Sequence, residues 1–181
     1  MIKKCFVLFW VLIACFTLFT ACDDSVYVSG IENFHEGVDY MGLAYGLLPK
    51  NREFLSDYPY KDGEYYFWAE DDFEGNIFVR LEYTDEIYYE AKNASIEFLD
   101  RVYADETVQY THNGFTFYAY YFWEEKSYGI RFVGYNDIDQ TLIFAGYYDC
   151  DANAHTRVEN SSFATIFDEE FGQYMCGQDH A

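Results

Sequence analysis

Residues 107–148 read TVQYTHNGFTFYAYYFWEEKSYGIRFVGYNDIDQTLIFAGYY, and this stretch decides the fold class. Apolar and aromatic residues that favour strands are interrupted by polar turn sequences at 112–114, 124–127 and 136–140. The first of these, His-Asn-Gly, is typical of a tight hairpin turn. The pattern therefore predicts an antiparallel meander of four strands, over residues 107–111, 115–123, 128–135 and 141–148.

Upstream of the meander, a strand pattern changes into a helical one. Residues 64–70 are rich in strand formers, and apolar residues alternate with others over 77–83, which predicts a hairpin across the acidic turn 71–75. Thr84 or Asp85 can cap the helix that follows. The apolar positions of this helix recur every three or four residues, at Ile87, Ala91, Ala94, Phe98 and Val102.

A second helix is predicted near the C-terminus, from Ser161 or Ser162 to Tyr174, with Gly177 after it. Strands and helices are segregated along the chain, which indicates the α+β class. We expect an antiparallel sheet of about five to six strands, with the central amphipathic helix and the C-terminal helix packed on one face. Residues 34–181 are expected to form a single domain.

The composition limits the kind of partner. The 181 residues include 32 acidic and 11 basic side chains, which gives a formal net charge of −21, and 23% of the residues are aromatic. So aromatic a chain is unlike those that remain disordered. Its charge would repel nucleic-acid phosphates and anionic lipid surfaces, and it favours a basic or cationic partner.

The N-terminal segment predicts export. Lys3 and Lys4 precede residues 5–21, which carry no charge, and this arrangement is typical of a signal peptide over residues 1–21. A plain secretory signal cleaved near Ala21 is one interpretation, and an uncleaved N-terminal anchor is another. All interpretations place the domain outside the cytoplasmic membrane.

A third interpretation comes from residues 18–22, LFTAC, which resemble the lipobox of bacterial lipoprotein precursors. Thr20 and Ala21 fit that pattern, whereas Phe19 stands where Leu, Val or Ile is usual. The resemblance implies cleavage before Cys22, a lipid on its sulfur, and attachment to the extracytoplasmic face of the cell membrane.

Two further expectations concern the exported chain. Residues 22–33 are polar and contain glycine, which predicts a tether between the lipid and the domain. The thiols that remain in the domain are those of Cys150 and Cys176, and an oxidising location favours a disulfide between them. Two buried free thiols are the alternative.

Residues 149–153, DCDAN, match the opening of a calcium loop. However, Ala154 and Asn160 stand where such a loop needs Gly and Glu, and the four histidines are scattered. We expect no metal ion and no cofactor, and we assign no catalytic residue.

The sequence YYFW occurs at 65–68 and again at 120–123. Trp68 is followed closely by Glu70, and Trp123 directly by Glu124. Aromatic rings beside carboxylates can stack on sugar rings and accept hydrogen bonds from their hydroxyls, so these four residues are candidates for ligand binding. The alternative is that the rings fill a two-sided core.

Three functions remain open. The first hypothesis is a non-enzymatic, membrane-tethered domain that binds an envelope or secreted protein. The second is a glycan-binding module that uses the exposed aromatic residues. The third is a hydrolase whose site has no recognisable motif.

Overall fold

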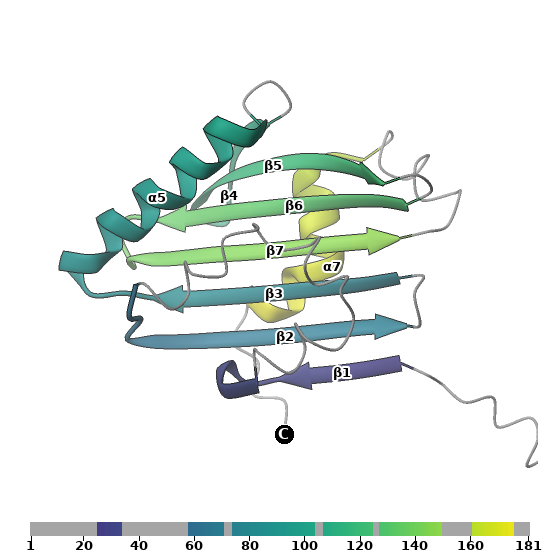
Figure 1. Cartoon of the computed structure of the whole chain (residues 1–181), viewed down its shortest axis with the longest axis horizontal. Coiled ribbons are helices and arrows are strands. Elements are labelled where there is room, and N and C mark those ends of the chain that lie inside the picture. Colours follow the sequence, from purple (N-terminus) through teal and green to yellow (C-terminus); the bar gives the residue numbers. More distant parts are fainter. Residues whose placement is uncertain are drawn as a thin grey trace, which may run out of the picture.

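The computed structural model describes residues 25–33, 58–70, 74–103, 107–124, 127–149 and 161–175. In this part of the chain, a seven-stranded antiparallel sheet packs against two α-helices (Figure 1). The predicted α+β class is confirmed, with seven strands in place of the expected five to six. The strands are β1 (Ser25–Ser29), β2 (Asp62–Glu70), β3 (Glu74–Glu82), β4 (Val108–His112), β5 (Phe115–Glu124), β6 (Ser127–Asn136) and β7 (Thr141–Asp149). The helices are α5 (Asp85–Tyr103) and α7 (Phe163–Met175), and a short 3-10 helix, η1 (Ile31–Asn33), follows β1.

The strand order is β1-β2-β3-β7-β6-β5-β4, so the sheet consists of two meanders rather than one. Helix α5 carries the chain from β3 to β4 at the far edge, and the second meander then returns until β7 pairs with β3. From β3 to β4 the sheet is about 19 Å wide, because neighbouring strands lie about 4.8 Å apart. A helix of 19 residues is about 28 Å long and can span that width.

Strand β1 corrects the prediction of a tether over residues 22–33. Val26, Tyr27 and Val28 lie in an edge strand that pairs with β2, from Ser25 opposite Glu70 to Ser29 opposite Tyr66. Residues 25–33 therefore belong to the sheet and to η1, and the folded domain begins before residue 34.

The two helices lie on opposite faces of the sheet, which corrects the expectation that both cover one face. In Figure 1, α7 crosses behind the strands, whereas α5 lies on the other side. Tyr88 and Ala91 of α5 belong to a core that includes Tyr65 and Phe67. The physical reason is that consecutive aromatic residues in a strand point to both faces, and each apolar face needs a cover.

The face of the sheet under α7 holds a second core of aromatic rings. Phe167 and Phe171 of α7 pack on Phe132, with ring centroids 5.2 and 5.9 Å apart. Close packing also fixes Gly134 of β6, because a Cβ atom there would overlap the ring of Phe117. Only glycine allows the Phe117 ring to cross β6 at this point.

Polar contacts hold both helices in place. Asp137, in the turn between β6 and β7, accepts hydrogen bonds from the Tyr88 hydroxyl (2.8 Å) and the Lys92 ammonium group (2.6 Å) of α5. Helix α7 begins as predicted, since Ser162 Oγ accepts a hydrogen bond from the backbone N–H of Thr165 (3.2 Å). His112, at the end of β4, lies 2.7 Å from Asp168 of α7.

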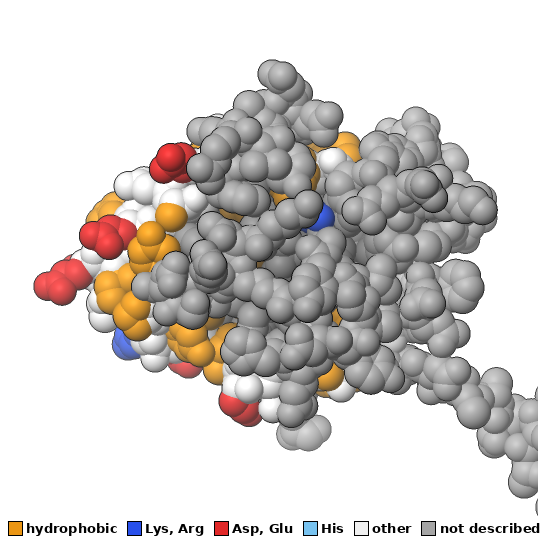
Figure 2. Space-filling model, in the orientation of Figure 1, with side chains coloured by type: hydrophobic (Ala, Val, Ile, Leu, Met, Phe, Trp, Pro, Cys, Tyr) orange, Lys and Arg blue, Asp and Glu red, His pale blue; other side chains and the backbone are white. Residues whose placement is uncertain are grey.

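Acidic side chains gather at the end of the molecule where α5 lies (Figure 2). Among the described helices, neither α5 nor α7 is both long enough and apolar enough to cross a membrane.

Candidate functional site

A candidate site lies where α7 ends and the sheet continues. Phe163, in the first turn of α7, packs on Tyr121 of β5 with ring centroids 4.5 Å apart, and Tyr174, in the last turn, stacks on Tyr66 of β2 at 4.4 Å. A helix of 13 residues is about 20 Å long. Seven strands span about 29 Å, so α7 cannot cover the whole sheet. Beyond its end, the Tyr27 side chain on β1 is 56% exposed.

The strand register brings the residues of this site together. Tyr27 of β1 pairs with Trp68 of β2, Trp68 pairs with Asn76 of β3, and Asn76 pairs with Tyr147 of β7. Directly opposed residues in antiparallel strands point to the same face, with Cβ atoms about 5 Å apart. These four residues therefore form a row on the α7 face, which we call the pocket row.

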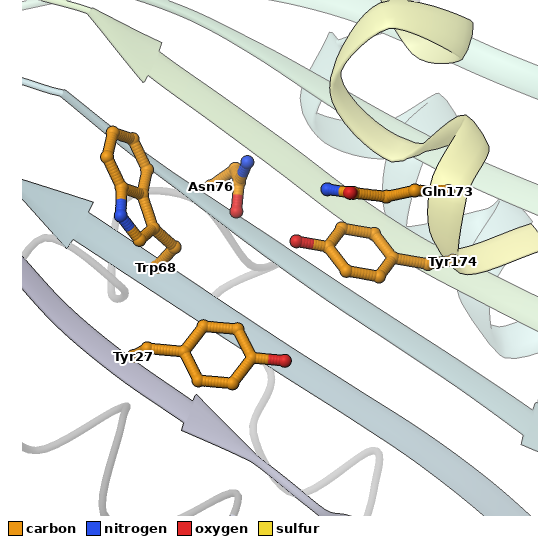
Figure 3. A pocket seen from close by; sticks show the side chains of 5 residues that line it. All are labelled: Tyr27, Trp68, Asn76, Gln173 and Tyr174. Carbon is orange, nitrogen blue, oxygen red and sulfur yellow. The ribbon is translucent and has the colours of Figure 1, made fainter. Parts of the chain in front are cut away.

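Tyr27, Trp68 and Asn76 of the pocket row, together with Gln173 and Tyr174 of α7, line an open pocket of about 330 Å³ (Figure 3). The Tyr174 hydroxyl and the Gln173 amide point from the helix toward the strands. Ligand pockets in proteins start at about this volume, so the space suits one small ring.

Asn76 is the most unusual residue of the pocket. Its side chain is 8% exposed, and its amide oxygen Oδ1 is buried without a hydrogen-bond partner. This oxygen points into the space between Trp68, Tyr27 and Tyr174 (Figure 3). An unsatisfied buried acceptor costs about 1–3 kcal/mol, and folded proteins contain few of them. A ligand that donates a hydrogen bond here would remove that cost.

Tyr174 and Gln173 supply further polar groups. Burial raises the pKa of the Tyr174 hydroxyl above its usual 10.0, with a hydrogen bond from Gln173 acting in the opposite direction. The phenol therefore remains protonated at physiological pH and can donate or accept a hydrogen bond. Gln173 is exposed at the rim, where its amide can both donate and accept.

An acidic side chain borders the pocket row. Glu74 of β3 lies two residues along the strand from Asn76, or about 7 Å, and its backbone pairs with those of Glu70 and Asp149. Tyr147 joins this carboxylate to the pocket row, because its hydroxyl donates a hydrogen bond to Glu74 (3.3 Å).

Comparison of the chain with protein-family models, curated proteins and solved structures finds no match. The residues of this pocket are therefore the basis on which a function can be proposed.

The structure places the predicted ligand-binding residues in two separate regions. Trp68 lines the pocket, whereas Glu70 is the last residue of β2 and its side chain lies outside the described part. Trp123 and Glu124 end strand β5, which three strands separate from β2, and their side chains lie outside the described part. The two YYFW segments therefore do not form one site. Cys22, Cys150 and Cys176 also lie outside the described residues.

The sequence analysis does not identify four of the residues that line the pocket, namely Tyr27, Asn76, Gln173 and Tyr174. Valine alternates with other residues over 25–29, and this pattern could have predicted strand β1 and hence the position of Tyr27. Among the described side chains, no group of three or more potential metal ligands occurs.

Proposed function

We propose that the chain is a lipid-anchored, extracytoplasmic domain that binds a sugar ring in the pocket of Tyr27, Trp68, Asn76, Gln173 and Tyr174. The proposal joins the lipobox-like segment ending at Cys22 with the glycan-binding hypothesis for Trp68. The observation that carries it is the unpartnered oxygen of Asn76 beside the partly exposed indole ring of Trp68.

A sugar ring matches these groups chemically. Its C–H face is apolar and flat enough to lie against the ring of Trp68 or Tyr27, while its hydroxyls lie around the edge. One hydroxyl can donate to Asn76 Oδ1, and others can exchange hydrogen bonds with Gln173 and Tyr174. A volume of about 330 Å³ favours one sugar unit of a chain rather than a long cleft.

The same residues favour binding over catalysis. Glycoside hydrolysis uses two carboxyl groups on either side of the scissile bond. Among the described residues, those that line the pocket are aromatic rings and amides, and none of these carries a carboxylate. The alternative is a basic envelope protein as partner. It is supported by the net charge of −21 and not by the residues of the pocket.

Calorimetric titration tests the proposal. The full chain, purified in a non-ionic detergent, is titrated with a panel of cell-wall and plant oligosaccharides. We expect at least one of them to bind, and we expect Trp68→Ala to weaken that binding about ten-fold, the equivalent of about 1.4 kcal/mol. Tyr89→Ala is the matched control, because Tyr89 is a 54% exposed aromatic residue on α5, on the other side of the sheet.

The control variant should bind as the unchanged chain does. A panel in which nothing binds would contradict the proposal. Equal affinity of Trp68→Ala and the unchanged chain would contradict it as well.

A further inference from the structure

We infer that the pocket recognises an N-acetyl group, so that it prefers an N-acetylated sugar to one with a hydroxyl or a free amine at the same position. This inference rests on the proposed sugar binding and names the substituent that the pocket selects. An N-acetyl group consists of an N–H donor, a carbonyl acceptor and a methyl group. Among the described lining residues, Asn76, Tyr174 and Trp68 offer one partner for each of these.

Asn76 is the partner for the N–H group. Its oxygen Oδ1 is an acceptor without a hydrogen-bond partner, and its side chain is more than nine-tenths buried. An amide N–H brings one donor and no acceptor on the same atom. A hydroxyl also donates one hydrogen bond, but its lone pairs then need donors at the buried end of the pocket. The amide therefore satisfies Asn76 without burying a new acceptor beside it.

Tyr174 is the partner for the carbonyl oxygen. Its hydroxyl interacts with the Gln173 side chain, whose amide can donate to the phenol oxygen. A phenol that accepts one hydrogen bond still has its own proton to donate, and a neighbouring hydrogen bond strengthens that donor. The hydroxyl points from α7 toward the strands, into the space that the Asn76 oxygen also faces (Figure 3).

The strand register places these two groups on either side of that space. Tyr174 stacks on Tyr66 at 4.4 Å and lies 5.5 Å from Phe78, and these two residues are directly opposed in β2 and β3. Asn76 lies two residues along β3 from Phe78, or about 7 Å. A trans amide directs its N–H and its C=O in opposite directions. One amide can therefore lie between Asn76 and Tyr174 and bond to both.

Aromatic rings are the partner for the methyl group. Trp68 is directly opposed to Asn76 and is partly exposed. Tyr27 is directly opposed to Trp68 on its other side and lines the same pocket. Burying one methyl group against such rings raises the affinity about four-fold. A hydroxyl in the same place would leave the rings without this contact, and a free amine would leave Tyr174 without a carbonyl acceptor.

The size of the preference follows from two gains over a hydroxyl. One is the methyl contact, and the other is the hydrogen bond to the carbonyl oxygen. A neutral hydrogen bond adds roughly two- to ten-fold in affinity. Ordering the flexible group in the pocket offsets part of these gains, so we expect a preference of about ten-fold.

The experiment compares three disaccharides by calorimetric titration of the full chain in non-ionic detergent. They are the disaccharide of N-acetylglucosamine, its glucose counterpart and its free-amine counterpart. We expect the N-acetylated sugar to bind about ten-fold more tightly than either of the others. Tyr174→Phe removes the donor to the carbonyl and keeps the ring, so it should reduce the preference about three- to five-fold. Tyr89→Phe, which removes an exposed hydroxyl from α5, is the matched control and should leave the preference unchanged.

Gln173→Ala is a second variant that keeps the inference testable if Tyr174→Phe does not fold. Gln173 is exposed at the rim, so its removal leaves the core intact. Tyr174 would lose the neighbour that strengthens its hydroxyl as a donor, and the preference should fall about two-fold.

Each outcome has a distinct meaning. Equal affinity for the N-acetylated and the glucose disaccharide would overturn the N-acetyl preference and leave the proposed sugar binding intact. A free amine that bound as tightly as the N-acetylated sugar would overturn it too, since the carbonyl and the methyl group would then play no part. A full preference retained in both Tyr174→Phe and Gln173→Ala would have the same consequence. If none of the three disaccharides and no member of the panel bound, the proposed function would fall with it.

Discussion

Asn76 is a residue whose side chain is expected to lower the stability of the fold. Its neighbours on the same face of β3 and β7 are Phe78 and Tyr147, so an apolar side chain would suit the position. The amide instead leaves Oδ1 buried without a partner, at the floor of the pocket. Residues that trade stability for activity are typical of functional sites.

This interpretation predicts that Asn76→Leu stabilises the chain. Removing an unsatisfied buried acceptor should raise the free energy of unfolding by about 1 kcal/mol, and the same change should abolish binding in the pocket. Urea unfolding measures the first effect, and calorimetric titration measures the second.

Asn136→Leu is the matched control for this prediction. Asn136 is also 8% exposed, but its amide is satisfied: it donates to Asp139 (2.7 Å) and accepts from the backbone N–H of Ile138 (2.9 Å). This substitution should destabilise the chain by about 1–3 kcal/mol. If Asn76→Leu were as destabilising as Asn136→Leu, the oxygen of Asn76 would have a structural role.

At the residue scale, the sequence allowed only part of the site to be predicted. Trp68 was identified because an aromatic ring near a carboxylate is visible along the chain. Asn76 and Tyr174 could not be identified, because they meet Trp68 only through the pairing of β2 with β3 and the packing of α7. Strand register and helix placement are long-range properties, and no local pattern reports them.

At the scale of elements, the contact between α5 and the β6–β7 turn is sensitive to pH. The Lys92 ammonium group and, to a smaller extent, the Tyr88 hydroxyl hold the pKa of Asp137 below its ordinary value of 3.8. A carboxyl group whose pKa is lower in the folded than in the unfolded chain stabilises the fold at pH values above its unfolded pKa. This contribution disappears as the pH falls through the folded pKa. The contact therefore weakens only in acid, below about pH 4.

Asp137→Asn tests this contact. At neutral pH the variant should be less stable by about 0.5 kcal/mol, a small effect because the Asp137 side chain is 51% exposed. The difference from the unchanged chain should vanish below about pH 4, as urea unfolding over a pH series would reveal. A difference that stayed constant with pH would show that the charge of Asp137 is not involved; Glu90→Gln on α5 provides the comparison.

Elements were predicted more completely than the way they pack. The apolar positions predicted for the central helix run as far as Val102, and α5 ends at Tyr103; the later strands agree within about two residues. Local periodicity fixes such boundaries. The choice of face for each helix was wrong, because strands that are aromatic on both sides give no sign of which helix covers which side.

At the scale of the whole molecule, the sheet has two edges of different character. Strand β4 forms one edge, with Val108 exposed, and β1 forms the other, beside the pocket. The edge strand β1 also begins a short distance along the chain from the lipobox-like cysteine. The proposed anchor and the proposed pocket thus belong to the same edge.

The anchor itself is open to direct measurement. Cells grown with labelled palmitate should incorporate the label into the chain, and Cys22→Ser should abolish incorporation. Label that persisted in Cys22→Ser would remove the lipoprotein assignment. An unlabelled chain would do the same, leaving a secretory signal or an uncleaved anchor.

Strand β1 begins close to Cys22 in the sequence. In an acylated chain, this limits the distance between the bilayer and the start of the folded domain. Three residues after Cys22 reach at most about 11 Å, and Tyr27 is at most about 18 Å from the acylated sulfur along the backbone. Such a domain would stay close to the lipid headgroups, because no long flexible tether would separate it from the bilayer. Its pocket would meet only those molecules that approach within roughly two nanometres of the bilayer surface.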